Sequence, residues 1–172
     1  MAFKTQKQLT EYFQTFKKLD GTEIDNVGDY IDNYILKSPN EQYEIFIGTD
    51  SQKVRKRNLV WYATVICIYK RGKGAHIIYS KEKRQDITGL LNRLREEVNY
   101  SLGLAIYLRD TETLYNRNVV KLHLDLSRNI KNKSNAIYNE MTGWVTGMGF
   151  DWTTKPESPA SSYAADMVVR LS

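Results

Sequence analysis

From residue 43 onward, apolar and polar residues alternate with a period of two, which predicts β-strands. The first such segment, YEIFIGTD, places Ile45 and Ile47 on one face and Gly48 and Asp50 on the other. Two further strands are predicted over LVWYATVICIYK and AHIIYS, after the polar turns VRKRN and RGKG. Because the connections between these three strands are short, an antiparallel meander is expected.

The period then changes to that of a helix. Over residues 86–108, apolar residues recur every three or four positions, which predicts a long helix with one buried stripe. The next segments predict a fourth strand (VVKLHLDL), a second core helix (KSNAIYNEMTGWVTGMG) with Trp144 on its buried face, and a short fifth strand (FDWTT). Ser158 and Pro159 are typical of the start of a last helix. The predicted order is βββαβαβα, an α/β fold with a mixed five-stranded sheet flanked by helices.

Residues 1–40 have a helical pattern of their own. Apolar residues from Leu9 to Leu19 predict a first helix, which ends at Asp20-Gly21, and those from Ile24 to Ile35 predict a second. We interpret residues 1–40 as an N-terminal helical extension packed on a main domain of residues 41–172. The alternative is an arm that forms a homo-oligomer or binds a partner protein.

Composition narrows the class of protein. The chain has 172 residues and a single cysteine, Cys67, so an intrachain disulfide and a cysteine-rich zinc site are both excluded. Neither a secretory signal nor an apolar run long enough to cross a membrane is present, so we expect a cytoplasmic protein without a membrane partner. The net charge of +5 favours a polyanionic partner.

Two aspartates stand at the ends of predicted strands. Asp50 closes the first strand and Asp125 closes the fourth. If these strands are parallel neighbours, both carboxylates lie at one end of the sheet and repel each other unless a cation lies between them. Such oxygen ligands suit Mg²⁺ or Mn²⁺. Each aspartate taken alone is also compatible with an ordinary turn-forming role.

The long helix offers two glutamates. At 100° per residue, Glu97 lies beside the apolar stripe and can face the sheet, whereas Glu96 lies on the opposite side in solvent. Glu97 is therefore the better candidate, and a solvated helix charge is the alternative.

The element order and four acidic positions resemble the ribonuclease H superfamily. More specifically, IGTDSQ, KLHLDLSRN, GWVTGMGFDWTTKPES and SSYAAD resemble the YkuK-type family of ribonuclease H-like proteins, over about residues 43–172. The resemblance implies Asp50, Glu97, Asp125 and Asp166 as catalytic metal ligands of an enzyme that acts on nucleic-acid phosphodiesters with two Mg²⁺ or Mn²⁺ ions. Asp166 rests on the resemblance alone, because helix phase does not place it.

Basic residues are expected to surround these acids. Strand directions place three basic segments at the same end of the sheet as Asp50, and place Lys70, Arg71 and Lys73 at the other end. With Lys155, the candidate nucleic-acid-binding residues are Lys53, Arg55, Lys56, Arg57, Lys81, Lys83, Arg84, Arg128, Lys131, Lys133 and Lys155. Such a rim suits a phosphate backbone, although turns are commonly polar for other reasons. His123 shares a strand face with Asp125 and is either a proton-transfer group or a satisfied structural histidine.

The pattern as a whole favours a metal-dependent nuclease, or a related phosphodiester-acting enzyme, on RNA, DNA or a hybrid. A non-catalytic nucleic-acid-binding protein of the same fold is the second interpretation. A protein-interaction module that uses the N-terminal helices is the third.

Overall fold

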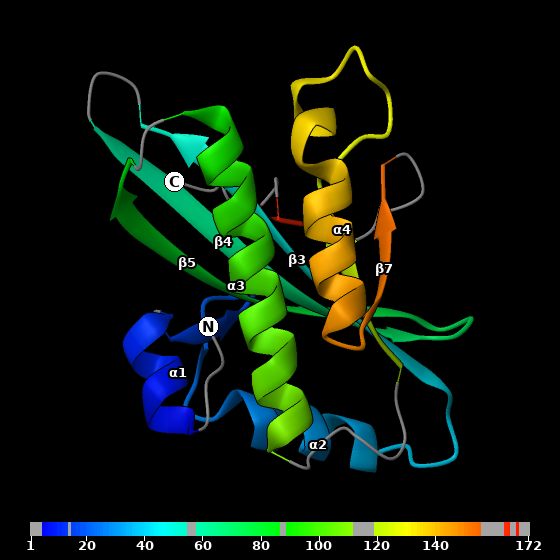
Figure 1. The fold of residues 1–172 in the computed structure, drawn as a ribbon. Helices are drawn as coiled ribbons and strands as arrows, with labels where there is room; N and C mark the ends of the chain where they lie inside the picture. Colours follow the sequence, from blue (N-terminus) through cyan, green and yellow to red (C-terminus); the bar gives the residue numbers. More distant parts are fainter. Residues whose placement is uncertain are drawn as a thin grey trace.

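A mixed sheet of seven strands runs through the molecule in the order β2-β1-β5-β4-β3-β6-β7 (Figure 1). The computed structural model describes residues 5–13, 15–54, 58–86, 89–111, 119–155, 164–165 and 168. The elements are α1 (Gln6–Tyr12), β1 (Phe16–Lys18), β2 (Glu23–Ile24), α2 (Val27–Leu36), β3 (Tyr43–Lys53), β4 (Leu59–Lys70), β5 (Gly74–Gln85), α3 (Leu90–Asp110), β6 (Val119–Leu124), the 3-10 helix η1 (Lys133–Ile137), α4 (Tyr138–Gly147) and β7 (Asp151–Thr154).

The predicted meander is confirmed, and the first and fourth of the predicted strands are parallel neighbours, as the placing of Asp50 and Asp125 at one end of the sheet requires. Strand β4 pairs antiparallel with both β3 and β5, while β6 is parallel to its neighbours β3 and β7. The long helix α3 carries the chain from the end of β5 back to the start of β6, as a parallel neighbour requires. The predicted count of five strands is too low, because β1 and β2 extend the sheet beyond β5.

The helical prediction for residues 1–40 is wrong in its middle part. Helix α1 starts with a capping box between Thr5 and Gln8 but ends at Tyr12, and β1 follows and pairs with β5. Phe13 and Phe16 are both buried, so their spacing of three continues across a helix–strand break. Gly21, with a φ of 88°, forms the turn into β2, and Leu19 is half-exposed.

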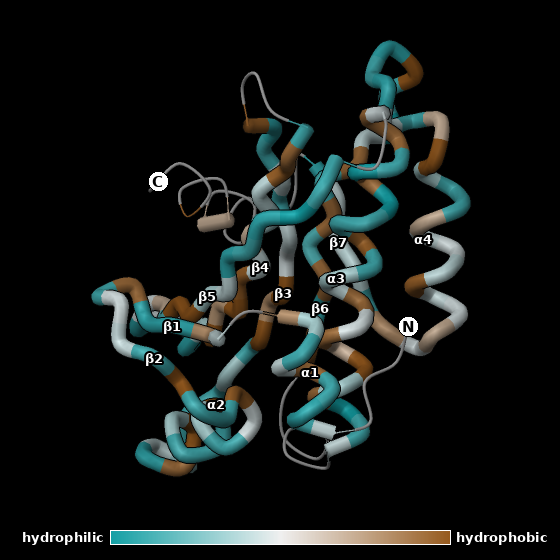
Figure 2. Tube along the Cα trace, turned by 90° about the vertical axis from the view of Figure 1, so that its left-hand side faces the viewer, coloured by the Kyte–Doolittle hydropathy of each residue, from teal (hydrophilic) through white to brown (hydrophobic). Residues whose placement is uncertain are grey.

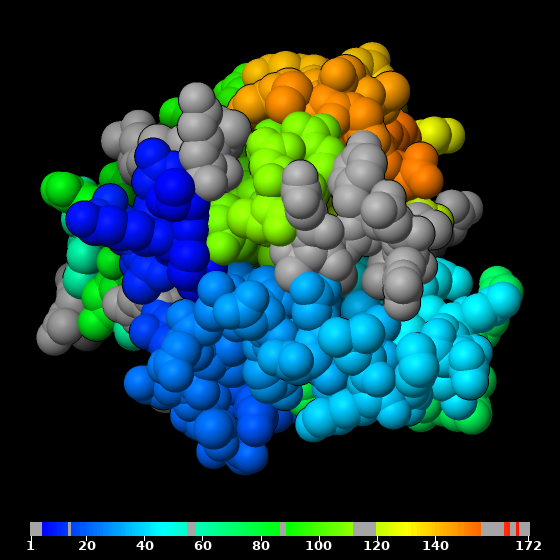
Figure 3. Space-filling view, turned by 90° about the horizontal axis from the view of Figure 1, so that it is seen from below, coloured from blue at the N-terminus to red at the C-terminus, as the bar shows by residue number. Residues whose placement is uncertain are grey.

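The N-terminal elements pack onto the rest of the chain. Figure 3 shows α1 and α2 (blue) lying beside the end of α3 (yellow-green). The rings of Tyr12 and Tyr100 are 5.0 Å apart, and Tyr34 stacks on His76 of β5 at 4.5 Å. The apolar faces of both helices are buried in the main core with Ile45, Leu104 and Leu122. The apolar faces of α1 and α2 are therefore covered by other parts of the same chain.

The two faces of the sheet have different covers. Helices α3 and α4 lie side by side on one face (Figures 1 and 2), above the main core. On the other face, Ala164, Ala165 and Val168 form a small core with Ala63 and Val65 of β4. Adjacent residues of a strand point to opposite faces, so every residue of β3 belongs to one layer or the other.

The predicted second core helix is divided into η1 and α4. Gly149, with a φ of 83°, lies just after α4, as the glycines in this segment predict. Met141 and Val145 face the core, but Trp144 is 38% exposed, so its predicted burial is wrong. It lies three residues from Met141, at the margin of the apolar stripe rather than in its centre.

Candidate functional site

A row of charged side chains crosses one end of the sheet on the face opposite α3. The β3–β6 register pairs Gly48 with His123, so Asp50 is level with Asp125, which directly follows β6. The β6–β7 register pairs Leu124 with Thr154, so Lys155 is level with Asp125. Along β4 and β5, Ala63 and Lys81 complete this row. Because side chains alternate along strands, all five residues point to one face.

Glu97 approaches this row from α3. It is 6% exposed, and the Ser51 hydroxyl donates a hydrogen bond of 2.6 Å to its Oε1. Ser51 follows Asp50 on β3 and therefore faces α3, as does Thr49, whose hydroxyl is 2.8 Å from that of Ser101. The structure thus places Glu97 against the sheet, as predicted, whereas Glu96 is half-buried, so its predicted place in solvent is wrong.

The carboxylates are close enough to influence one another. Burial raises the pKa of Glu97 well above its usual value; the Ser51 hydrogen bond lowers it, and the charges of Asp50 and Asp125 raise it again. Burial and neighbouring negative charges both disfavour the ionised form of a carboxyl. A cation bound near Asp50, Glu97 and Asp125 would oppose these effects and favour the ionised forms.

Lys155 supplies a cation in this structure. Its Nζ lies 2.7 Å from Oδ1 of Asp125. Burial lowers the pKa of Lys155, but the hydrogen bond to Asp125 and the charges of Asp125, Asp50 and Glu97 outweigh it and raise the pKa above its usual value. The ammonium group is thus held in the electrostatic field of all three carboxylates.

The acids are nevertheless not arranged as ligands of one ion. Among the residues that the structure describes, no three His, Cys, Asp or Glu side chains are close enough to share a metal. Asp125 faces Lys155, Glu97 faces Ser51, and Oδ1 of Asp50 accepts a hydrogen bond of 2.8 Å from the Ser51 amide. This agrees with the electrostatics, because carboxylates without a shared cation repel each other.

The fourth predicted ligand, Asp166, lies outside the described residues. Its neighbour Ala165 is 1% exposed and packs in the small core that contains Ala63. Ala63 is the cross-strand partner of Asp50. This end of the chain therefore contacts the same sheet face as Asp50.

His123 lies below the acidic row on the same face. Its ring is 4.6 Å from that of Phe46, and burial lowers its pKa to about 4, with a smaller contribution from Lys121. Among the residues that the structure describes, its buried Nδ1 has no hydrogen-bond partner, nor does Oγ1 of its cross-strand neighbour Thr153. His123 is therefore neutral at pH 7, and it is not the satisfied structural histidine that was one of the two interpretations.

The residues of the predicted basic rim differ in their partners and in their positions. Lys53 pairs with Asp86 at 2.5 Å, and Arg84 pairs with Glu82 at 2.8 Å. Lys81 and Lys83 lie on the acidic face: Lys83 is directly opposite the half-buried Trp61, and Lys81 is opposite Ala63. The Lys81 ammonium also donates a hydrogen bond of 3.2 Å to the Val168 carbonyl. Arg55, Lys56 and Arg57 lie outside the described residues.

The remaining basic residues lie in the loop after β6 and at the far end of the sheet. Arg128 and Lys155 line a pocket of about 400 Å³ next to the acidic row. Lys131 and Lys133 are exposed in the same loop. At the far end, Lys70 and Lys73 pair with Glu41, and Arg71 lies 3.9 Å from Glu44. Acidic partners therefore offset the far-end cluster, whereas Lys83 has no acidic partner among the described residues.

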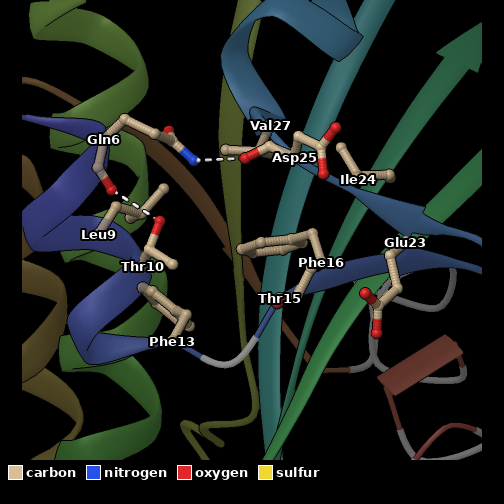
Figure 4. Close-up of a pocket in the computed structure, with 10 residues that line it drawn as sticks. All are labelled: Gln6, Leu9, Thr10, Phe13, Thr15, Phe16, Glu23, Ile24, Asp25 and Val27. Carbon is tan, nitrogen blue, oxygen red and sulfur yellow. Dashed lines mark hydrogen bonds between the residues drawn. The ribbon is translucent and has the colours of Figure 1, made fainter.

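A second pocket, of about 220 Å³, lies at the opposite edge of the sheet between α1, β1, β2 and α2 (Figure 4). Phe13, Phe16 and Ile24 give it an apolar lining, and Gln6 donates a hydrogen bond of 3.3 Å to the Asp25 carbonyl at its margin. Glu23 and Asp25 also line it, but they lie at the opposite edge of the sheet from Asp50 and Asp125.

Two side chains of the site were missed from the sequence. Ser51 could have been found, because strand alternation after Asp50 directs it toward the helix that carries Glu97. Trp61 was not singled out, because its strand is apolar on both faces, and it is half-buried.

Comparison with known proteins agrees with this arrangement. The family model described as ribonuclease H-like matches residues 26–170. The chain belongs to the ribonuclease H-like family. A relative of this ribonuclease H-like chain, the uncharacterised protein YkuK of Bacillus subtilis (strain 168), is 28% identical over 148 residues, which cover 76% of this chain and 82% of the relative. No solved structure is significantly similar.

Membership of the ribonuclease H-like family indicates a nuclease-like or otherwise nucleic-acid-related role. Within the described part of the chain, no helix is long and apolar enough to cross a membrane.

Proposed function

We propose that this ribonuclease H-like protein is a divalent-metal-dependent nuclease that hydrolyses phosphodiester bonds of nucleic acid. The observation that supports it most is that Asp50 and Asp125 are level on one face of the sheet, with the Lys155 ammonium 2.7 Å from Asp125 and within the electrostatic field of Asp50 and Glu97. An acidic cluster that already attracts one positive charge is suited to a metal ion. The family match supports the same chemistry.

The donor set fits Mg²⁺ or Mn²⁺. All three carboxylates offer hard oxygen ligands, and neither sulfur nor a second imidazole is near to favour a softer metal within the described row. Asp50, Glu97 and Asp125 would hold the ions, with Asp166 as the fourth ligand implied by the family resemblance. Bound ions of this kind lower the pKa of a coordinated water and stabilise a leaving oxygen.

The protein's own groups have separate roles in this proposal. Ser51 orients the buried Glu97 through its 2.6 Å hydrogen bond. Lys155, half-exposed beside Asp125, holds a positive charge where a scissile phosphate would approach the acids. Lys81, Lys83, Arg128, Lys131 and Lys133 position the backbone without reading its sequence.

The second candidate function is a nucleic-acid-binding protein without catalysis. One observation favours it. Each of the three acids has a partner within the chain, and among the described residues the three are not close enough together to share a metal ion. Binding that is insensitive to divalent ions would support this alternative.

The test is a cleavage assay on labelled RNA, DNA and hybrid substrates with Mg²⁺ or Mn²⁺. We expect activity that EDTA abolishes and that Asp50→Asn or Asp125→Asn lowers by at least 100-fold, in line with losses for essential catalytic groups. Asp151→Asn is the matched control, because Asp151 is exposed and lies at the start of β7, away from the row. Cleavage that survives in both variants would refute the assignment.

A further inference from the structure

Trp61 lies beside two lysines of β5 on the face of the sheet that carries the acidic row. Its ring is 4.6 Å from the Lys83 ammonium and 4.9 Å from that of Lys81. The register places Gln52, Trp61 and Lys83 in one row across β3, β4 and β5, directly beyond the row of Asp50, Ala63 and Lys81. An aromatic ring, two cations and the acids thus share one end of one face.

Within the described part of the chain, Trp61 belongs to neither hydrophobic core. The neighbours of Trp61 on β4, Val60 and Tyr62, are buried on the α3 side, whereas Trp61 itself is half-buried on the other side. Lys83 is exposed, so its ammonium rests on the indole although water is available to it. A cation–π contact at such an exposed place is weak and is readily exchanged for a phosphate.

We propose that Trp61, Lys81 and Lys83 form a surface for single-stranded nucleic acid, with an unpaired base stacked on Trp61 and phosphates held by the lysines. This assignment rests on the proposed function in one respect, namely that the bound nucleic acid continues to the acidic row. The geometry suits this continuation. Strand β5 is the second neighbour of β3, about 10 Å away, so a nucleic acid bound at Lys81 needs to continue only about that distance to reach Asp50.

The chemistry selects an unpaired strand rather than a duplex. Base faces inside a duplex are covered by their neighbours, so an indole on a sheet surface can stack only on an unpaired or terminal base. Stacking needs no base-specific hydrogen bonds, and the lysines contact the backbone alone. Binding is therefore expected to tolerate sequence and to depend on strandedness and salt.

The experiment measures binding of a short labelled oligonucleotide by fluorescence anisotropy, with the full chain in EDTA so that neither cleavage nor metal contributes. A single-stranded pyrimidine oligonucleotide is compared with the same oligonucleotide annealed to its complement. Trp61→Leu keeps an apolar side chain but removes the aromatic face, and Trp61→Phe keeps a ring. The matched control is Trp144→Leu, because Trp144 is a 38% exposed tryptophan on α4, on the other face of the sheet.

We expect Trp61→Leu to weaken single-strand binding by roughly 5- to 150-fold, the loss typical of one stacked base. Trp61→Phe should retain most of the affinity, and Trp144→Leu should change nothing. Lys83→Gln should weaken binding and make its salt dependence shallower. The duplex should bind more weakly than the single strand and respond little to Trp61→Leu.

Equal losses from Trp61→Leu and Trp144→Leu, or equal losses for single strand and duplex, would overturn the proposal. So would absence of binding at low salt. These failures can be distinguished from a failure of the nuclease assignment, because that assignment is read from the metal response and cleavage by Asp50 variants, which the EDTA experiment does not involve.

Discussion

Replacing Lys155 by Met should have opposite effects on the metal-free and metal-loaded protein. In the metal-free state the Lys155 ammonium lies 2.7 Å from Asp125 and interacts with Asp50 and Glu97. Its removal takes away the positive charge next to Asp125 and one of the positive charges that act on Asp50 and Glu97, which lowers stability. The same removal frees Asp125 and eliminates a repelling cation, so Mg²⁺ should bind more tightly.

The expected loss of stability is modest because the Lys155–Asp125 pair is accessible to water. The side chains of Lys155 and Asp125 are 55% and 31% exposed, so a surface value of at most about 1 kcal/mol is appropriate. For a chain of this size, about 1 kcal/mol corresponds to a decrease in Tm of about 2–4 °C without metal. The same free energy corresponds to Mg²⁺ binding that is about fivefold tighter.

Calorimetric titration with Mg²⁺ and thermal unfolding in EDTA measure the two effects. Lys155→Arg, which keeps the charge, should resemble the unmodified chain in both. Lys131→Met removes an exposed lysine from the loop at the same end of the sheet and controls for net charge. Our reasoning is refuted if Lys155→Met binds Mg²⁺ no more tightly than the unmodified chain, or if Lys131→Met strengthens binding equally.

Three further predictions concern stability. The pKa of Glu97 is raised in the folded state, so the stability that this carboxyl contributes is fully present below its pKa in the unfolded chain and is lost as pH rises through its pKa in the folded protein. Glu97→Gln should remove this pH-dependent loss of stability, measured by denaturant titration in EDTA. His123 has a pKa lowered to about 4, so stability should fall by up to about 3 kcal/mol from pH 6.5 toward 4, and His123→Phe should remove that dependence. Ala63 is 0% exposed beneath Ala164 and Ala165, so Ala63→Leu should destabilise the fold by about 1–3 kcal/mol in urea unfolding, whereas exposed Gln52→Leu should not.

The spacing of apolar residues was sufficient to place a side chain where a single physical constraint acted. Alternation in YEIFIGTD and VVKLHLDL placed Asp50 and Asp125 on one face, and the parallel β3–β6 register made them level. Helix phase distinguished Glu97 from Glu96, because a helix packed on a sheet has a single buried stripe.

Periodicity was insufficient where two elements met or where tertiary contacts decided the outcome. Phe13 and Phe16 keep a helical spacing although the chain changes from helix to strand between them, because both side chains reach the same core. The contact between Lys155 and Asp125 joins the ends of two strands, and sequence spacing does not encode it. Trp61 shows a similar limit, since an apolar strand pattern does not reveal which face remains open to solvent.

The most direct test of the metal-site assignment is a crystal structure grown with Mn²⁺, with anomalous diffraction used to locate the ions. Our account predicts manganese between the carboxylates of Asp50 and Asp125, with Glu97 turned toward it and Lys155 moved from its 2.7 Å contact with Asp125. The Asp50→Asn protein treated in the same way should show no such peak. Well-occupied Mn²⁺ elsewhere, or acids that keep their present partners at millimolar Mn²⁺, would contradict the account.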